Sequence, residues 1–214
     1  MEKPSEEQWN AGIRVLRYLK TTAANYIMYQ GQKNWTQTSA YSDADWASNK
    51  NCRKLMSGTM VMINESPVIF KSKYQQSVAL STAEAEYMTL SLCVQEVLWR
   101  NNLLTEMKVQ VRFPVRIYED NQSTIALANN DGDQSRAKHI DIRHHFVRQH
   151  VKLNNITLEY IESRKQLADF LTNPLSARQF QDLVTKSNIG KCMSRGSVVQ
   201  TESSTITANQ SEAE

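Results

Sequence analysis

One passage from strand to helix governs the topology that this sequence predicts, and it reads Val115-Arg116-Ile117-Tyr118-Glu119-Asp120-Asn121-Gln122-Ser123. Its first half, Val115–Glu119, carries apolar residues between turn-forming neighbours, which is typical of a buried strand. The polar second half ends that strand and opens a short helix, Thr124–Ala128. A strand followed directly by a helix indicates the alternating part of an α/β sheet.

The chain before this passage is rich in β-forming residues and predicts a different arrangement. Strands are expected over 26–29, 37–45, 57–63 and 68–73. The last three are separated by short polar links, with a turn at Asn64-Glu65-Ser66-Pro67, and this spacing predicts an antiparallel meander.

Helical periodicity appears in four regions. Trp9, Ile13, Leu16 and Leu19 recur at three- and four-residue steps, so an amphipathic helix is expected over 5–20, capped by Ser5. Ser81 followed by Glu84 resembles a capping box and starts a long helix, 82–107. A further helix is expected over 139–153, then a strand over 156–161 and a helical region over 166–184 interrupted at Pro174. Antiparallel strands followed by alternating strands and helices predict a mixed α/β sheet.

Length, composition and charge favour a globular domain with extensions. The 214 residues are 40% hydrophobic, which is enough for a core. Without the three glutamates of the last eighteen residues, the net charge of +3 becomes +6, and this basic excess suits a polyanionic partner. Cys52, Cys93 and Cys192 show no paired spacing, so a reducing intracellular compartment is expected. No apolar run approaches membrane-spanning length, and no membrane partner is expected.

Aspartates in a strand are the first candidates for chemistry. Asp43 and Asp45 lie in the strand 37–45, although aspartate is a poor strand former. Strand alternation puts both on one face, so periodicity does not choose between them. An exposed strand end is the alternative explanation.

Glu84 and Glu86 open the long helix and point in different directions, since two helical residues are about 200° apart. Glu84 is expected to close the capping box, and Glu86 is the better candidate for a site. Asp120 stands where the buried strand gives way to a helix, and Asp169 interrupts an apolar helical face. Each has a structural alternative, as an N-cap or a solvated acid. Together, carboxylates from distant parts of the chain suit binding of hard divalent cations.

The ordered motifs of the chain resemble those of the ribonuclease H domain in the Pol polyprotein of copia-type LTR retrotransposons. The matching blocks are Tyr41-Ser42-Asp43-Ala44-Asp45-Trp46-Ala47, Ser57-Gly58, Lys71-Ser72-Lys73 with Gln76, Val78-Ala79-Leu80-Ser81-Thr82-Ala83-Glu84-Ala85-Glu86-Tyr87, Glu119-Asp120-Asn121-Gln122-Ser123, Lys138-His139-Ile140-Asp141-Ile142-Arg143 and Ala168-Asp169-Phe170-Leu171-Thr172. The resemblance runs from about Trp9 to Gly190. The chain departs from the usual pattern at Asn173, where the family carries lysine.

The resemblance implies a ribonuclease H-like fold, in which helices flank a mixed five-stranded sheet. Matched motif by motif, it assigns the catalytic, metal-binding carboxylates to Asp43, Glu86, Asp120 and Asp169, with two Mg²⁺ or Mn²⁺ ions as cofactors. It also implies that residues 1–34 are a remnant of the link from the reverse transcriptase, which is a possible partner. The expected domains are therefore this link, a ribonuclease H-like domain over 35–190, and a disordered tail over 191–214.

Basic side chains are the candidates for gripping a nucleic acid through its phosphates. They are Arg53, Lys54, Lys71, Lys73, Arg136, Lys138, Arg143 and Arg148. Any one of them has the alternative of being an ordinary solvated side chain. The four histidines, of which three cluster at 144–150, have no Cys, Asp or Glu at a zinc-ligand spacing, so a zinc site is not expected.

The function expected from these observations is hydrolysis of the RNA strand of RNA–DNA hybrids by two-metal catalysis, in the cytoplasm (in a virus-like particle) or the nucleus. One alternative is a catalytically inactive transposon remnant that binds nucleic acid or protein. Another is a different nuclease of related fold, such as an integrase or transposase.

Overall fold

The structure, a computed structural model, describes residues 3–29, 36–45, 55–75, 79, 81–130 and 138–191, without the side chains of residues 138–141 and 191. The chain divides into two compact units, Met1–Tyr26 with Lys191–Glu214, and Ile27–Gly190. The second unit ends where the expected domain ends and begins at residue 27 rather than 35. The expected tail beyond residue 191 lies outside the described residues.

The first unit contains helix α1, Glu6–Thr22, where the sequence predicted one. Its start is a complete capping box, since the Ser5 hydroxyl accepts a bond from the Gln8 amide at 3.3 Å and Gln8 Oε1 accepts one from the Ser5 amide at 3.0 Å. A short strand, β1, follows at Asn25–Ile27.

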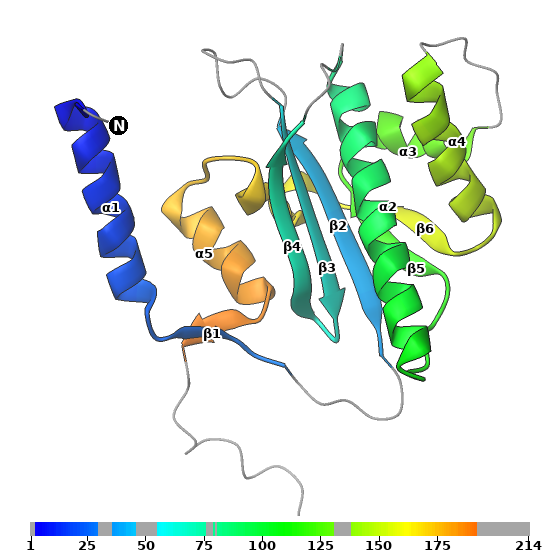
Figure 1. Cartoon of the computed structure of the whole chain (residues 1–214), viewed down its shortest axis with the longest axis horizontal. Coiled ribbons are helices and arrows are strands. Elements are labelled where there is room, and N and C mark those ends of the chain that lie inside the picture. The colour runs from blue at the N-terminus through cyan, green and yellow to red at the C-terminus, as the bar shows by residue number, and fades with distance from the viewer. Residues whose placement is uncertain are drawn as a thin grey trace, which may run out of the picture. The chain divides into compact units, whose positions relative to one another are not determined.

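The second unit is built on a five-stranded mixed sheet with the order β4-β3-β2-β5-β6 (Figure 1). The strands are β2 (Thr38–Asp45), β3 (Met56–Ile63), β4 (Ser66–Tyr74), β5 (Val115–Glu119) and β6 (Ile156–Tyr160). The first three pair antiparallel, which confirms the predicted meander. β5 pairs parallel with both β2 and β6, so the predicted mixed sheet is confirmed.

The hairpin between β3 and β4 is tighter than the sequence predicted. Only Asn64 and Glu65 form the loop, and both have positive φ angles, 48° and 64°. Such two-residue loops match the right-handed twist of the strands that they join. The prediction that the turn extends to Pro67 was wrong, because Pro67 pairs with Met62 inside β4, beside a shift in register. A proline fits there because the strand lies at the sheet edge and the ladder is interrupted.

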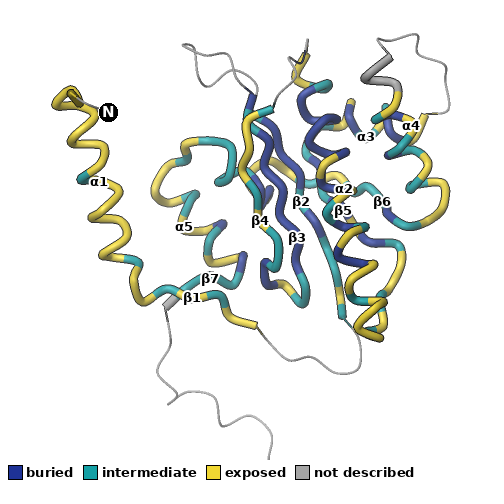
Figure 2. Tube along the Cα trace, viewed as in Figure 1, coloured by how far each residue is buried: buried dark blue, intermediate teal, exposed yellow. Residues whose placement is uncertain are grey.

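Helices cover both faces of the sheet (Figure 1). On one face lie α2 (Thr82–Glu106), α3 (Gln122–Asn129) and α4 (Lys138–Lys152). The main core lies on this face, where Leu90 of α2 and Val147 of α4 belong to the same buried cluster as Val61 of β3 and Ile117 of β5. Figure 2 shows this buried centre running through β2, β3 and α2. On the other face, Leu183 of α5 (Ala177–Lys186) packs against residues of β3.

The segment before α5 is less helical than the sequence predicted. It forms two single turns of 3-10 helix, η1 (Ser163–Lys165) and η2 (Asp169–Leu171). The expected interruption at Pro174 is confirmed, because proline donates no amide hydrogen and disfavours a helical residue before it. α5 then starts afresh at Ser176, whose hydroxyl accepts a bond from the Gln179 amide at 3.3 Å. A last short strand, β7, covers Ile189–Lys191.

Candidate metal centre

Three of the four carboxylates singled out in the sequence meet in one group. Asp43, Glu86 and Asp120 each offer an oxygen atom, and these atoms all lie within 4.8 Å of one another. The topology explains the meeting, because β2 and β5 are parallel neighbours and their carboxyl ends share one edge of the sheet. Asp43 lies near the end of β2 and Asp120 directly after β5, while α2 brings Glu86 from above them.

The start of α2 fixes the orientation of Glu86. The Ser81 hydroxyl caps the helix by accepting a bond from the Glu84 amide at 3.2 Å, as the sequence predicted. Glu86 follows two residues later and turns inward, where the Ala44 amide donates to its carboxylate. Its Oε2 atom is buried and has no hydrogen-bond partner among the described residues. A buried carboxylate oxygen without a donor is costly unless a cation binds it.

The centre holds negative charges that repel one another out of water. Asp43 is only 5% exposed, and burial raises its pKa to about 7. Burial is the largest cause of this raised pKa, the charges of Asp120 and Asp169 contribute to it, and a hydrogen bond from Thr172 acts in the opposite direction. Burial also raises the pKa of Glu86 far above its usual range, with the charges of Glu119 and Asp43 adding to the effect. Such a site favours either protons or metal cations.

Glu119 belongs to this centre although sequence reasoning did not select it. It is fully buried beside Asp120, and burial raises its pKa well above the usual range. Its Oε2 accepts a hydrogen bond from the Ser42 hydroxyl at 2.7 Å, and its Oε1 accepts one from the Asn121 amide at 3.3 Å. Strand alternation could have found it, since Glu119 shares a face with Val115 and Ile117, which are buried.

Asp169, the fourth predicted carboxylate, stands beside the group and is held by two side-chain amides. Asn173 Nδ2 donates to its Oδ1 at 2.8 Å, and Gln179 Nε2 donates to its Oδ2 at 3.2 Å. Burial raises the pKa of Asp169, and the charge of Asp120 adds to this. The sequence predicted it on a helical face, but it opens the single turn η2.

The turn that carries Asp169 also contacts Asp43. The Thr172 hydroxyl donates to Asp43 Oδ2, and the side-chain Nδ2 of Asn173 donates to the same oxygen at 3.5 Å. Asn173 therefore bridges the two aspartates. The approach depends on Gly58, Asp43's partner on β3, since an added Cβ would lie 2.6 Å from Thr172 Cγ2 and 3.0 Å from the Ala168 carbonyl oxygen.

The basic residues predicted to hold a nucleic acid are only partly described. Arg53, Lys54 and Arg136 lie outside the described residues, and so does the side chain of Lys138. Lys71 pairs with Glu96 of α2 at 2.5 Å, Lys73 is exposed, and Arg148 Nε donates to the Leu127 carbonyl at 3.2 Å. Arg143 has a buried Nη1 without a hydrogen-bond partner among the described residues.

Fold and site together define a mixed α/β domain with a centre of acidic residues that can hold a divalent metal ion. The homologues of the chain are Pol polyproteins of copia-type transposons. It is 37% identical over 191 residues to the Retrovirus-related Pol polyprotein from transposon RE2 of Arabidopsis thaliana, covering 89% of this chain. It is 32% identical over 181 residues to that of transposon TNT 1-94 of Nicotiana tabacum, covering 85%. The chain spans 13% of the length of each of these relatives.

Several solved structures that resemble the chain are ribonuclease H proteins. A ribonuclease H1 isolated from compost by a metagenomic approach has a TM-score of 0.49 and 14% identity, covering 66% of this chain and 94% of that one. The N-terminal ribonuclease H domain of a Mycobacterium tuberculosis protein has a TM-score of 0.49 and 11% identity, covering 69% and 98%. No protein-family model matches the chain. The relation to these polyproteins rests on the sequence matches.

Within the described part of the chain, none of the helices has both the length and the apolar character needed to cross a bilayer. Cys93 is a buried free thiol.

Proposed function

We propose that this chain is a ribonuclease H that hydrolyses the RNA strand of RNA–DNA hybrids with the help of two Mg²⁺ or Mn²⁺ ions. The observation that carries the proposal is the meeting of Asp43, Glu86 and Asp120, whose oxygen atoms lie within 4.8 Å of one another. Homology to transposon Pol polyproteins supports the choice of substrate, because reverse transcription of RNA produces hybrids.

The residues fit a divalent cation. All the donors are carboxylate oxygens, which are the ligands that Mg²⁺ and Mn²⁺ prefer. Asp43 and Glu86 are buried, the negative charges of the group repel one another, and Glu86 Oε2 has no hydrogen-bond donor among the described residues. A cation would remove both costs, whereas a purely structural cluster would leave them in place.

Each residue has a distinct task in the proposed site. Asp43 and Asp120 would bind metal from the two parallel strands, and Glu86 from the helix above them. Asp169, steadied by Asn173 and Gln179, would complete the site from the side. Two such ions, when bound, activate the attacking water and stabilise the leaving oxygen. The products would carry 3′-hydroxyl and 5′-phosphate ends, and no covalent enzyme intermediate is required.

The binding partners and the cellular location of the protein are also part of the proposal. A hybrid duplex is the expected partner, together with the reverse transcriptase part of the same polyprotein. The expected location is cytoplasmic, in a virus-like particle, or nuclear.

The decisive experiment is cleavage of an end-labelled RNA–DNA hybrid, with duplex DNA and duplex RNA as controls. We expect cleavage of the hybrid's RNA strand only, with Mg²⁺ or Mn²⁺ and not with a chelator. Asp43→Asn or Glu86→Gln should lower the rate by at least about 10³-fold, since several kcal/mol of transition-state stabilisation depend on the metals. Asp182→Asn, which removes an exposed carboxylate of α5, should leave the rate unchanged.

Two results would speak against the proposal. Metal-dependent cleavage that survives in both variants would show that these carboxylates are not the metal ligands. Tight hybrid binding without any cleavage by the unaltered chain would favour the inactive binding module instead.

A further inference from the structure

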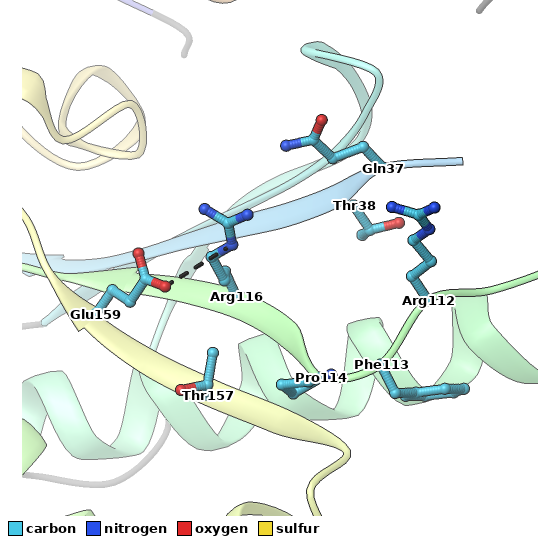
Figure 3. A pocket seen from close by; sticks show the side chains of 8 residues that line it. All are labelled: Gln37, Thr38, Arg112, Phe113, Pro114, Arg116, Thr157 and Glu159. Atoms are coloured by element: carbon cyan, nitrogen blue, oxygen red, sulfur yellow. Dashed lines mark ion pairs between the residues drawn. The ribbon is translucent and has the colours of Figure 1, made fainter. Parts of the chain in front are cut away.

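A second charged site lies at the opposite end of β5 from the acidic centre. A cavity of about 450 Å³ opens there, of a size typical of ligand pockets. Its lining includes Gln37, Thr38, Arg112, Phe113 and Arg116, and these residues define what we call the arginine pocket. Figure 3 shows the guanidinium groups of Arg112 and Arg116 and the amide of Gln37 on the same side of the strands.

Positive charge exceeds negative charge in the arginine pocket. Its lining contains one carboxylate, Glu159, whose Oε1 lies 3.7 Å from Arg116 Nε. That distance and the half-exposed side chains make it a weak ion pair, which a better anion can displace. Two arginines and one carboxylate leave the lining with a net positive charge.

A third arginine, Arg100, is not part of the lining but contacts one of its residues. Arg100 of α2 is 3% exposed, and its Nη1 donates to Thr38 Oγ1 at 2.8 Å. Its Nε and Nη2 atoms are buried and have no hydrogen-bond partner among the described residues. Burial lowers the pKa of Arg100 to about 10, which reflects the cost of placing a cation away from water. Arg100 therefore supports Thr38, a residue of the lining, from the side of the sheet that α2 covers.

The ligand chemistry follows from these donors. Planar guanidinium groups are suited to phosphate, which they bind through paired hydrogen bonds. The Thr38 hydroxyl accepts from Arg100, so its own proton can be donated to an anion. The exposed ring of Phe113 adds a flat surface on which a base can stack.

We propose that the arginine pocket binds a phosphate group of a nucleic-acid strand. The choice of a nucleic-acid source rests on the proposed function, whereas the choice of phosphate rests on the pocket. Arg116 precedes Asp120 by four residues, so the pocket lies about 13 Å from the acidic centre along the strand. Phosphates of one strand follow at about 3.4 Å along the helix axis, so the contact requires a substrate that extends roughly four nucleotides beyond the cleaved bond.

The test measures binding separately from cleavage. A fluorescent hybrid of about 18 base pairs, long enough to pass both sites, is titrated in a chelator at several salt concentrations. We expect Arg116→Gln to weaken binding about tenfold and to lower the slope of log affinity against log salt by about 0.9. Glu159→Gln removes the competing carboxylate and should tighten binding. Arg116→Lys should restore the salt slope, and Arg17→Gln, an exposed arginine on α1, should change nothing.

Arg116→Gln should weaken hybrid binding and Glu159→Gln should tighten it, although both substitutions break the same ion pair. This difference distinguishes a loss of ligand binding from structural damage. If Arg116→Gln and Glu159→Gln weaken binding equally, or if neither changes the salt slope, the proposal is overturned. It is also overturned if inorganic phosphate or a mononucleotide binds in an Arg116-dependent way while hybrid binding does not depend on Arg116.

Cleavage is recorded on the same proteins in Mg²⁺. Arginine-dependent binding without cleavage would refute the proposed function and leave the arginine pocket standing. Cleavage by a protein whose hybrid binding does not depend on Arg116 would refute the arginine pocket and leave the proposed function standing.

Discussion

The two ends of strand β5 carry opposite charges, and the comparison shows how this domain uses buried charge. At one end, Asp120 meets Asp43 and Glu86. At the other end, Arg112 and Arg116 line the arginine pocket. Between them the strand is apolar on its buried face. Each end gathers like charges, and at the acidic end Glu86 Oε2 is buried without a hydrogen-bond partner among the described residues. We infer that both ends are built for ligands of opposite sign, which would supply the compensation that the fold does not.

The charged side chains at the two ends of β5 differ in how deeply they are buried. The carboxylates of Asp43 and Glu86 are almost completely buried, whereas half of the Arg116 side chain reaches solvent. Water and salt therefore screen the arginine end more strongly. Changes at the acidic end should consequently have larger effects on stability.

The largest of these effects should appear as a pH dependence of folding stability without metal. Asp43 has a pKa of about 7 in the folded state and about 3.8 when unfolded. Between these values the folded state binds more protons, so the free energy of unfolding should fall as pH rises from about 4 to 7. The shift corresponds to roughly 4 kcal/mol at most. Glu86, with its pKa raised in the same direction, should extend the fall above pH 7.

Urea unfolding in a chelator at a series of pH values measures this fall. Asp43→Asn should flatten the curve and stabilise the metal-free domain at pH 8, whereas Asp182→Asn should not. Added Mg²⁺ should restore stability to the unaltered chain at pH 8. A metal-free domain that gains stability from pH 5 to pH 8 would contradict the charge imbalance at the acidic end.

Much of the acidic centre could be predicted from local patterns, and the rest depends on long-range packing. Helix geometry correctly separated the inward Glu86 from the capping position of Glu84. Alternation could not choose between Asp43 and Asp45, because both share a face. The structure separates them by depth: Asp43 is buried, whereas Asp45, the last residue of β2, is half-buried.

The side contacts of the centre could not be predicted because they join distant segments. Strand alternation indicates that Glu119 is buried, but its contact with Ser42 exists only because β5 pairs with β2. The hydrogen bond from Thr172 to Asp43 depends on a close approach of η2 to Gly58, which no periodicity encodes.

A second prediction concerns the hydrogen bonds to Asp169. Gln179→Leu removes the donor to Asp169 Oδ2, while the Gln179 amide still caps α5 through Ser176. Hydrogen bonds that orient metal ligands typically contribute 10- to 100-fold in metal affinity. We expect Mn²⁺ binding, measured by calorimetry or paramagnetic resonance, to weaken within about that range.

The matched control is Gln181→Leu, an exposed glutamine on the same helix. It should bind Mn²⁺ as the unaltered chain does. Equal affinities in all three proteins would show that the hydrogen bond from Gln179 to Asp169 does not orient a metal ligand.

The smallest effect is expected where opposite charges already compensate each other. Lys71 Nζ lies 2.5 Å from Glu96 Oε1, with side chains 40% and 23% exposed. Such a pair contributes at most about 1 kcal/mol, so Lys71→Met should change the free energy of unfolding by less than that. Its charge is also partly neutralised, which makes it a weaker phosphate ligand than Lys73, two residues further along β4.

Hybrid binding in a chelator compares the two lysines directly. Lys73→Met should lower the salt slope by about one if Lys73 contacts a phosphate, and Lys71→Met should lower it less. Equal losses would mean that Lys71 leaves Glu96 when a nucleic acid binds. The positive charge of Lys71 would then become available to a phosphate only in the complex. Lys71 would contribute to binding as an unpaired lysine does, although it is paired with Glu96 in the free protein.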